Sequence, residues 1–225
     1  MDRPSPSQRA VLEDHLDALR SVRAAGLLFL FLLIAALVLE IGFYCAVRFG
    51  DVLAGLPAPP TCRASTAPTA LPPVAEPSAR AQTWGQAIEV LAPVYRVVGL
   101  VAACLLALTY FIGMNVCLAG RLGGAGGTTS AFFWSVLLVG LLFPWQHLLA
   151  TRGVWASGVF YGFAYLTYLQ QVAAVRPTGL VDNVLQHARY LGYPGLTILI
   201  ALLAGLRFGC GYRMARQQFD AAKSE

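Results

Sequence analysis

The sequence has few charged residues and no familiar catalytic signature. Only 12% of its 225 residues are Asp, Glu, Lys or Arg, against roughly 25% in ordinary soluble domains. It contains no HExxH, no G-x-S-x-G, no Asp-rich metal motif, and its five cysteines form no CxxC pair. These absences argue against an enzyme without excluding one, and we expect no cofactor or metal.

The chain also lacks a dense basic cluster. Its formal net charge is +5, and the Lys and Arg residues are scattered beside apolar runs. Such scattering is typical of residues that set membrane topology. A nucleic-acid partner is therefore not expected.

Long apolar runs are what the sequence does contain, and 57% of its residues are hydrophobic. A bilayer-crossing helix needs about 20 apolar residues. The first run is too long for the apolar region of a signal peptide, about 7–15 residues, so we expect a retained span. The sequence predicts an all-α integral membrane protein with these segments: a cytoplasmic amphipathic stub (1–23), span 1 (24–47), a Pro/Ala-rich extracytoplasmic linker (48–83), a long helix containing span 2 (84–120), a Gly-rich turn (121–130), span 3 (131–150), an interfacial aromatic segment (151–189), span 4 (190–212) and a cytoplasmic tail (213–225).

Two boundaries depend on local signals. Thr83 and Gln86 fit a T-x-x-Q capping box, which predicts that the second long helix begins at Trp84. Residues 153–175 are uncharged but rich in Tyr, Gly and Gln. We expect an interfacial or re-entrant helix there, and the alternative is a fifth span.

The distribution of arginines predicts the orientation. With four spans and an N-terminus inside, both termini are cytoplasmic, and we expect a multi-pass protein of the cell (inner) membrane. The inner side then holds Arg20, Arg23, Arg121, Arg213 and Arg216, whereas the outer side holds Arg48, Arg96, Arg152 and Arg189.

Glu40 is the one acid deep inside a predicted span. An intramembrane carboxyl is costly, and it is usually paired, protonated or functional. The predicted topology brings His147, Arg96 and Arg189 to the same side of the membrane. We therefore expect a polar site around Glu40, either a proton or cation site or a hydrogen bond that holds helices together.

Histidines and cysteines offer two weaker hypotheses. His147 and His187 would both lie near the outer face, where two imidazoles on neighbouring helices could ligate a haem iron or a metal. Cys45 and Cys62 would share an oxidising space and could form a disulfide.

Small residues recur every four positions in two predicted spans. Such faces let helix backbones approach closely. The second and fourth spans could therefore pack against each other or against a partner protein. The residues of these two faces are Gly99, Ala103 and Ala107, and Ala201, Gly205 and Gly209.

The stretch NVCLAGRLGG and the following AFFWSVLLVGLLFPWQ resemble uncharacterised multi-pass membrane proteins of planctomycete-type bacteria. The resemblance covers residues 115–146, with a weaker match at YLGYPGL. It implies a bacterial membrane location and carries over neither an activity nor a functional residue.

The first functional hypothesis is a non-enzymatic integral membrane protein, an assembly or accessory component that contacts lipid and other membrane proteins or copies of itself. The second is a component of a small-solute or ion transporter that uses Glu40. The third is a haem or metal-binding redox protein that uses His147 and His187.

Overall fold

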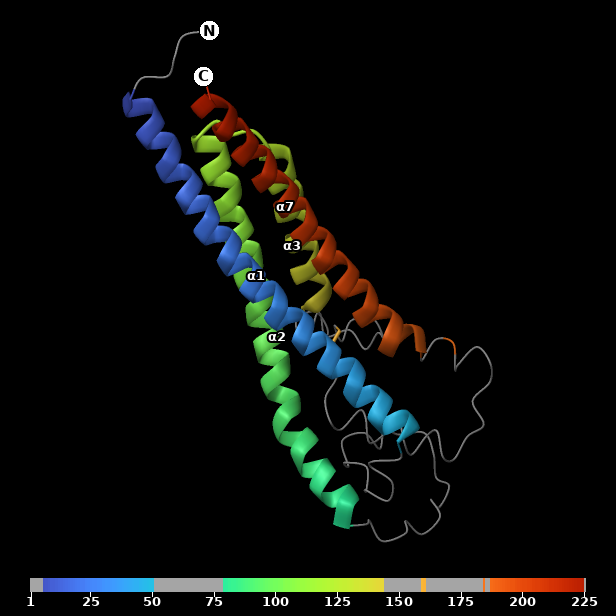
Figure 1. Cartoon of the computed structure of the whole chain (residues 1–225). Coiled ribbons are helices and arrows are strands. Elements are labelled where there is room, and N and C mark those ends of the chain that lie inside the picture. Colours follow the sequence, from blue (N-terminus) through green and yellow to red (C-terminus); the bar gives the residue numbers. More distant parts are fainter. Residues whose placement is uncertain (1–5, 51–78, 144–158, 161–183, 185–186, 225) are drawn as a thin grey trace. The chain divides into compact units, whose positions relative to one another are not determined.

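A computed structural model describes residues 6–50, 79–143, 159–160, 184 and 187–224. These residues are helical nearly throughout and include no strand, so the expected all-α class is confirmed for this part of the chain. The helices are α1 (Pro6–Phe49), α2 (Ala79–Ala119), α3 (Ala125–Leu142), the π-helix η3 (Ala188–Gly192) and α7 (Tyr193–Ser224) (Figure 1).

In the described part of the chain, four helical stretches are long and apolar enough to cross a membrane. They are Glu13–Phe49, Gln82–Ala119, Ala125–Leu142 and Ala188–Ala221. This number agrees with the four predicted spans. The expected interfacial or re-entrant helix lies mostly outside the described residues, as does most of the Pro/Ala-rich linker, so these two expectations stay predictions.

The helices extend beyond the apolar runs from which they were predicted. α1 is one continuous helix through both the amphipathic stub and the first span. α2 begins at Ala79, so Thr83 lies inside the helix and the predicted capping-box start is wrong. The preceding Ala79-Arg80-Ala81-Gln82 are all good helix formers, which explains the earlier start.

The third helix also begins before its predicted start. α3 starts at Ala125 and includes Gly126 and Gly127. The Thr128 hydroxyl donates to the Ala125 carbonyl at 2.9 Å, so Thr128 bonds within the helix rather than capping it. The Gly-rich turn is therefore confined to the residues before Ala125.

The chain divides into two compact units. Unit 1 comprises Met1–Ala35, Gly99–Leu142 and Leu196–Glu225, and unit 2 comprises Ala36–Val98 and Phe143–Gly195. Three helices contribute to both units, because α1, α2 and α7 are long.

In unit 1, α1 runs antiparallel to both α2 and α7 (Figure 1). The Tyr110 ring of α2 stacks on the Phe208 ring of α7, with centroids 4.7 Å apart. A Cβ added at Gly113 would meet Phe208 at 2.6 Å and Val22 of α1 at 3.1 Å. Glycine at this position therefore allows three helices to meet.

The α2–α3 connection and the first turn of α3 lie close to the backbone of α7 in unit 1. A Cβ added at Gly127 would lie 2.9 Å from the Gly211 Cα, and one added at Gly211 would lie 3.0 Å from the Thr128 nitrogen. A Cβ at Gly124 would overlap the Gly211 carbonyl oxygen, and Gly124 has a φ of 90°. The glycines therefore serve as a packing surface as well as a turn.

α2 ends in a Schellman motif whose left-handed position is occupied by arginine. The Leu122 amide donates to the Cys117 carbonyl at 3.0 Å, and the Arg121 amide donates to the Leu118 carbonyl at 3.3 Å. Arg121 has a φ of 48°, where glycine is the usual residue. Leu122 is buried, as the hydrophobic contact of this motif requires.

Arg121→Gly is expected to stabilise the protein by about 0.5–1 kcal/mol, because a side chain in the left-handed region is strained. Equilibrium unfolding in mixed detergent micelles measures the change. Arg121→Ala removes the same charge but keeps the Cβ, so it is the matched control. Equal stability of the two variants would contradict the conformational explanation.

Candidate functional site

Glu40 is a fully buried acid on α1 within unit 2. Its side chain is 0% exposed. The carboxyl interacts electrostatically with the phenol of Tyr95 on α2, and the phenol oxygen is itself buried. A carboxyl and a phenol thus lie near each other on two helices that are long and apolar enough to cross a membrane.

Aromatic rings surround Tyr95. Its ring centroid lies 5.5 Å from that of Phe43 on α1 and 6.1 Å from that of Phe160. Tyr95 is itself buried. These apolar rings exclude water from the Tyr95 phenol, and a low local dielectric strengthens its electrostatic interaction with the Glu40 carboxyl.

A second aromatic group lies one turn further along α1. Tyr44 stacks on Tyr190 of η3, with centroids 4.9 Å apart and ring planes 12° apart. The His187 ring meets Tyr44 edge-on at 6.3 Å and lies 6.5 Å from Phe49. Val47 and Ile88 complete this core.

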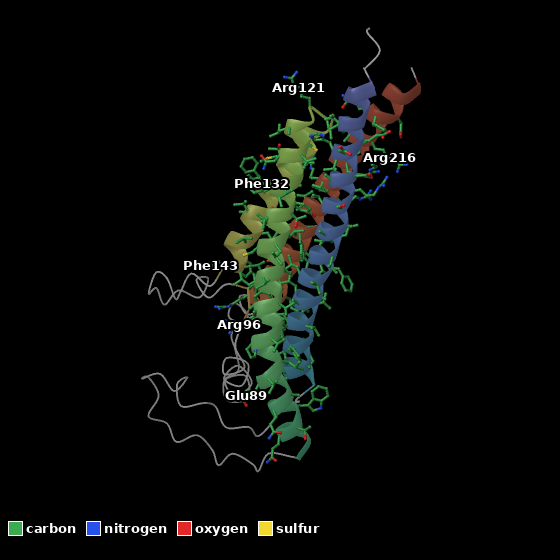
Figure 2. All side chains as sticks on the ribbon, turned by 90° about the vertical axis from the view of Figure 1, so that its left-hand side faces the viewer. Glu89, Arg96, Arg121, Phe132, Phe143 and Arg216 are labelled. Carbon is green, nitrogen blue, oxygen red and sulfur yellow. The ribbon has the colours of Figure 1, made fainter. Side chains whose placement is uncertain are left out.

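Three arginines in the described part of unit 2 lie near these aromatic rings. The Arg189 guanidinium is buried and lies 5.7 Å from the Tyr190 ring centroid. Arg48 lies 6.0 Å from the Phe49 ring centroid. Arg96 follows Tyr95 directly, acts on its phenol through charge and points outward from α2 in Figure 2. Aromatic and basic residues of this kind are typical of a membrane–water interface.

The structure describes three of the four residues of the predicted polar site. Glu40, Arg96 and Arg189 all belong to unit 2, and Tyr95 is one of the residues with which Glu40 interacts. His147 lies outside the described residues, so the four-residue polar site stays a prediction. Tyr95 and Tyr44 were not predicted to lie near Glu40, although Tyr44 stands four residues after Glu40 and therefore shares its face of α1.

The structure describes only one residue of each predicted histidine or cysteine pair. His187 packs as one ring of an aromatic cluster, while its proposed partner His147 falls outside the described residues. Cys45 packs beside the same cluster, and Cys62 is likewise outside. Among the described residues no three His, Cys, Asp or Glu side chains come together as a metal site. Haem ligation and the disulfide stay predictions.

The small-residue faces differ from one position to the next. Ala103 and Ala201 are completely buried. A Cβ added at Gly205 would lie 2.8 Å from Leu30 of α1, whereas one at Gly209 would meet nothing within 4 Å. Gly205 therefore accommodates a neighbouring helix, and Gly209 leaves open space. Gly99 is buried and Ala107 half-buried.

The described residues thus define a class: a helical protein with four candidate membrane spans and a fully buried acid, Glu40, in the first of them. Comparisons with protein-family models, with curated proteins and with solved structures find no match to this chain.

Proposed function

We propose that the protein is a non-enzymatic component of a bacterial inner-membrane assembly, with both termini in the cytoplasm. The observation that carries this proposal is a polar platform at one end of unit 1. The platform consists of residues 6–23 of α1, residues 213–224 of α7 and the connection 120–124. Both helices continue past their apolar runs there, so ordered helix extends beyond the bilayer.

The platform is packed as one piece. Leu19 of α1 and Ala215 of α7 are fully buried. The Gly123 amide donates to the Gln218 side-chain oxygen, and a Cβ at Gly120 would touch the His15 ring at 3.0 Å. Helical extensions fixed to a span in this way suit a docking surface for another protein.

The outer faces of the platform carry charges of both signs. Arg20 pairs with Asp17 at 3.1 Å, and Arg216 pairs with Asp220 at 3.8 Å. Figure 2 shows Arg121 and Arg216 at this same end of unit 1. Mixed surface charge supports orientation and selection of a protein partner more than affinity.

A purification in native lipid particles tests the proposal. We expect a stoichiometric membrane partner to accompany the full-length chain. Glu13→Lys combined with Asp14→Lys should reduce that partner by about tenfold or more, because opposed like charges across an interface cost several kcal/mol.

Glu89→Lys is the matched control, since it reverses an exposed acid of α2 that is not part of the platform (Figure 2). A partner that survives the platform reversal unchanged would contradict the proposal. A lone monomer after mild extraction would contradict it as well.

A component of a small-solute or ion transporter is the second candidate. The observation that favours it is the complete burial of Glu40 beside Tyr95, because intramembrane acids often mark proton or ion pathways. Flux through proteoliposomes that is unchanged by Glu40→Gln would exclude this acid as the transport site.

A further inference from the structure

A groove of about 300 Å³ opens on unit 1 between α1 and α7. The stacked rings of Tyr110 and Phe208 form its floor. Leu27 and Leu206 line its sides and are 55% and 64% exposed. The groove is therefore lined mainly by apolar side chains, which are exposed on the surface of unit 1.

Two glycines of α7 leave room in the groove for an acyl chain. Gly205 and Gly209 both line it, one turn apart on the same face of the helix. The Cβ position of Gly209 has no atom within 4 Å. A larger side chain at Gly209 would project into this open space rather than into the protein.

Two arginines mark one end of the groove. Arg23 directly precedes the apolar run of α1, and Arg213 directly follows that of α7. The Arg23 guanidinium lies 4.6 Å from the Tyr212 ring centroid, so the ends of the two apolar runs lie at one level. Arg213 donates to the Gly209 carbonyl at 3.4 Å, while Arg20 and Arg216 nearby are paired with Asp17 and Asp220.

We propose that this groove binds one anionic phospholipid. The phosphate of the headgroup lies between Arg23 and Arg213, and an acyl chain follows Leu27, Leu206 and the open side of Gly209. Basic pockets between membrane helices on the cytoplasmic side are suited to anionic headgroups.

The amphipathic lining selects this occupant over two others. A free phosphate would satisfy the guanidiniums but would leave the aromatic floor uncovered. An apolar helix of another protein would cover the floor but would leave two charges without a counterion, which is costly. A phospholipid complements both parts at the depth where the apolar runs end.

Native mass spectrometry of the full-length protein in detergent micelles tests the proposal. With equal amounts of phosphatidylglycerol and phosphatidylcholine, we expect one phosphatidylglycerol to be retained in preference. Arg23→Gln with Arg213→Gln should weaken retention about 25-fold, or about fivefold for each arginine. Arg20→Gln with Arg216→Gln removes the same charge outside the groove and should leave retention unchanged.

A second variant tests the acyl-chain half without altering charge. Gly209→Leu should fill the groove and reduce retention of phosphatidylglycerol. Gly42→Leu is the control, because a Cβ at Gly42 of α1 also meets nothing within 4 Å, and it should leave that retention unchanged. Unfolding of each variant by circular dichroism verifies that it is folded. Equal retention of phosphatidylcholine, equal losses in the two arginine pairs, full displacement by inorganic phosphate, or no effect of Gly209→Leu would each overturn the proposal.

Discussion

Gly124→Ala is expected to lower the free energy of unfolding by about 2–5 kcal/mol. The left-handed backbone at Gly124 costs a side chain about 1–2 kcal/mol. The new Cβ would also overlap the backbone of Gly211 on α7, and overpacking costs typically 1–3 kcal/mol. Because the obstacle is backbone rather than a flexible side chain, the contact cannot relax locally.

Equilibrium unfolding in mixed micelles, followed by far-UV circular dichroism, measures this loss. Gly126→Ala is the matched control, since a Cβ at Gly126 meets nothing within 4 Å. It should change stability by less than about 0.5 kcal/mol, or increase it slightly. If both alanine variants lose the same stability, the close backbone contact with α7 is not what requires glycine at residue 124.

Residues 121–130 show how far the sequence could lead. The glycines predicted a turn, and the described residues contain one, with Gly124 at a positive φ. The contact with Gly211 could not be predicted, because it depends on where a helix more than eighty residues later lies in space. Likewise, helix propensity does not reveal that Arg121, rather than a neighbouring glycine, takes the left-handed position that ends α2.

The apolar runs predicted the four candidate spans because their lengths reflect the thickness of a bilayer. They did not predict the helix ends, since polar helix formers such as those at 79–82 and 213–224 continue a helix outside the apolar core. The ends matter here, because the polar platform consists largely of such extensions.

Glu40 could be identified from the sequence by its position in an apolar run, but its partner could not. Topology suggested cations, because Arg96 and Arg189 share its side of the membrane. The structure places the phenol of Tyr95 near the carboxyl, and the apolar runs did not indicate this neighbour. Which side chain of a neighbouring helix faces an acid depends on the rotation of that helix about its axis, which apolar runs do not define.

Glu40→Ala should lower the free energy of unfolding by about 2–3 kcal/mol. The substitution leaves a cavity among packed helices, and it removes a polar contact with Tyr95, where polar contacts between helices inside membranes are worth about 0.6 to 1.7 kcal/mol. Glu40→Gln keeps the volume and a polar group beside Tyr95, so its cost should stay within about 1 kcal/mol. Unfolding in mixed micelles distinguishes the two variants.

Tyr95→Phe separates a purely structural role of this pair from a functional one. If Glu40 only holds α1 to α2, Tyr95→Phe and Glu40→Ala should be non-additive in stability, with a coupling energy of about 0.5–1.5 kcal/mol, and Glu40→Gln should leave every activity of the assembly intact. If Glu40 binds a transported proton or cation, Glu40→Gln should abolish flux through proteoliposomes while the protein stays folded. Additive losses would contradict an energetic link between the two residues. Unchanged flux together with clear coupling would identify Glu40 as a helix-holding residue, because a neutral amide can replace a hydrogen-bonded carboxyl but cannot release a proton.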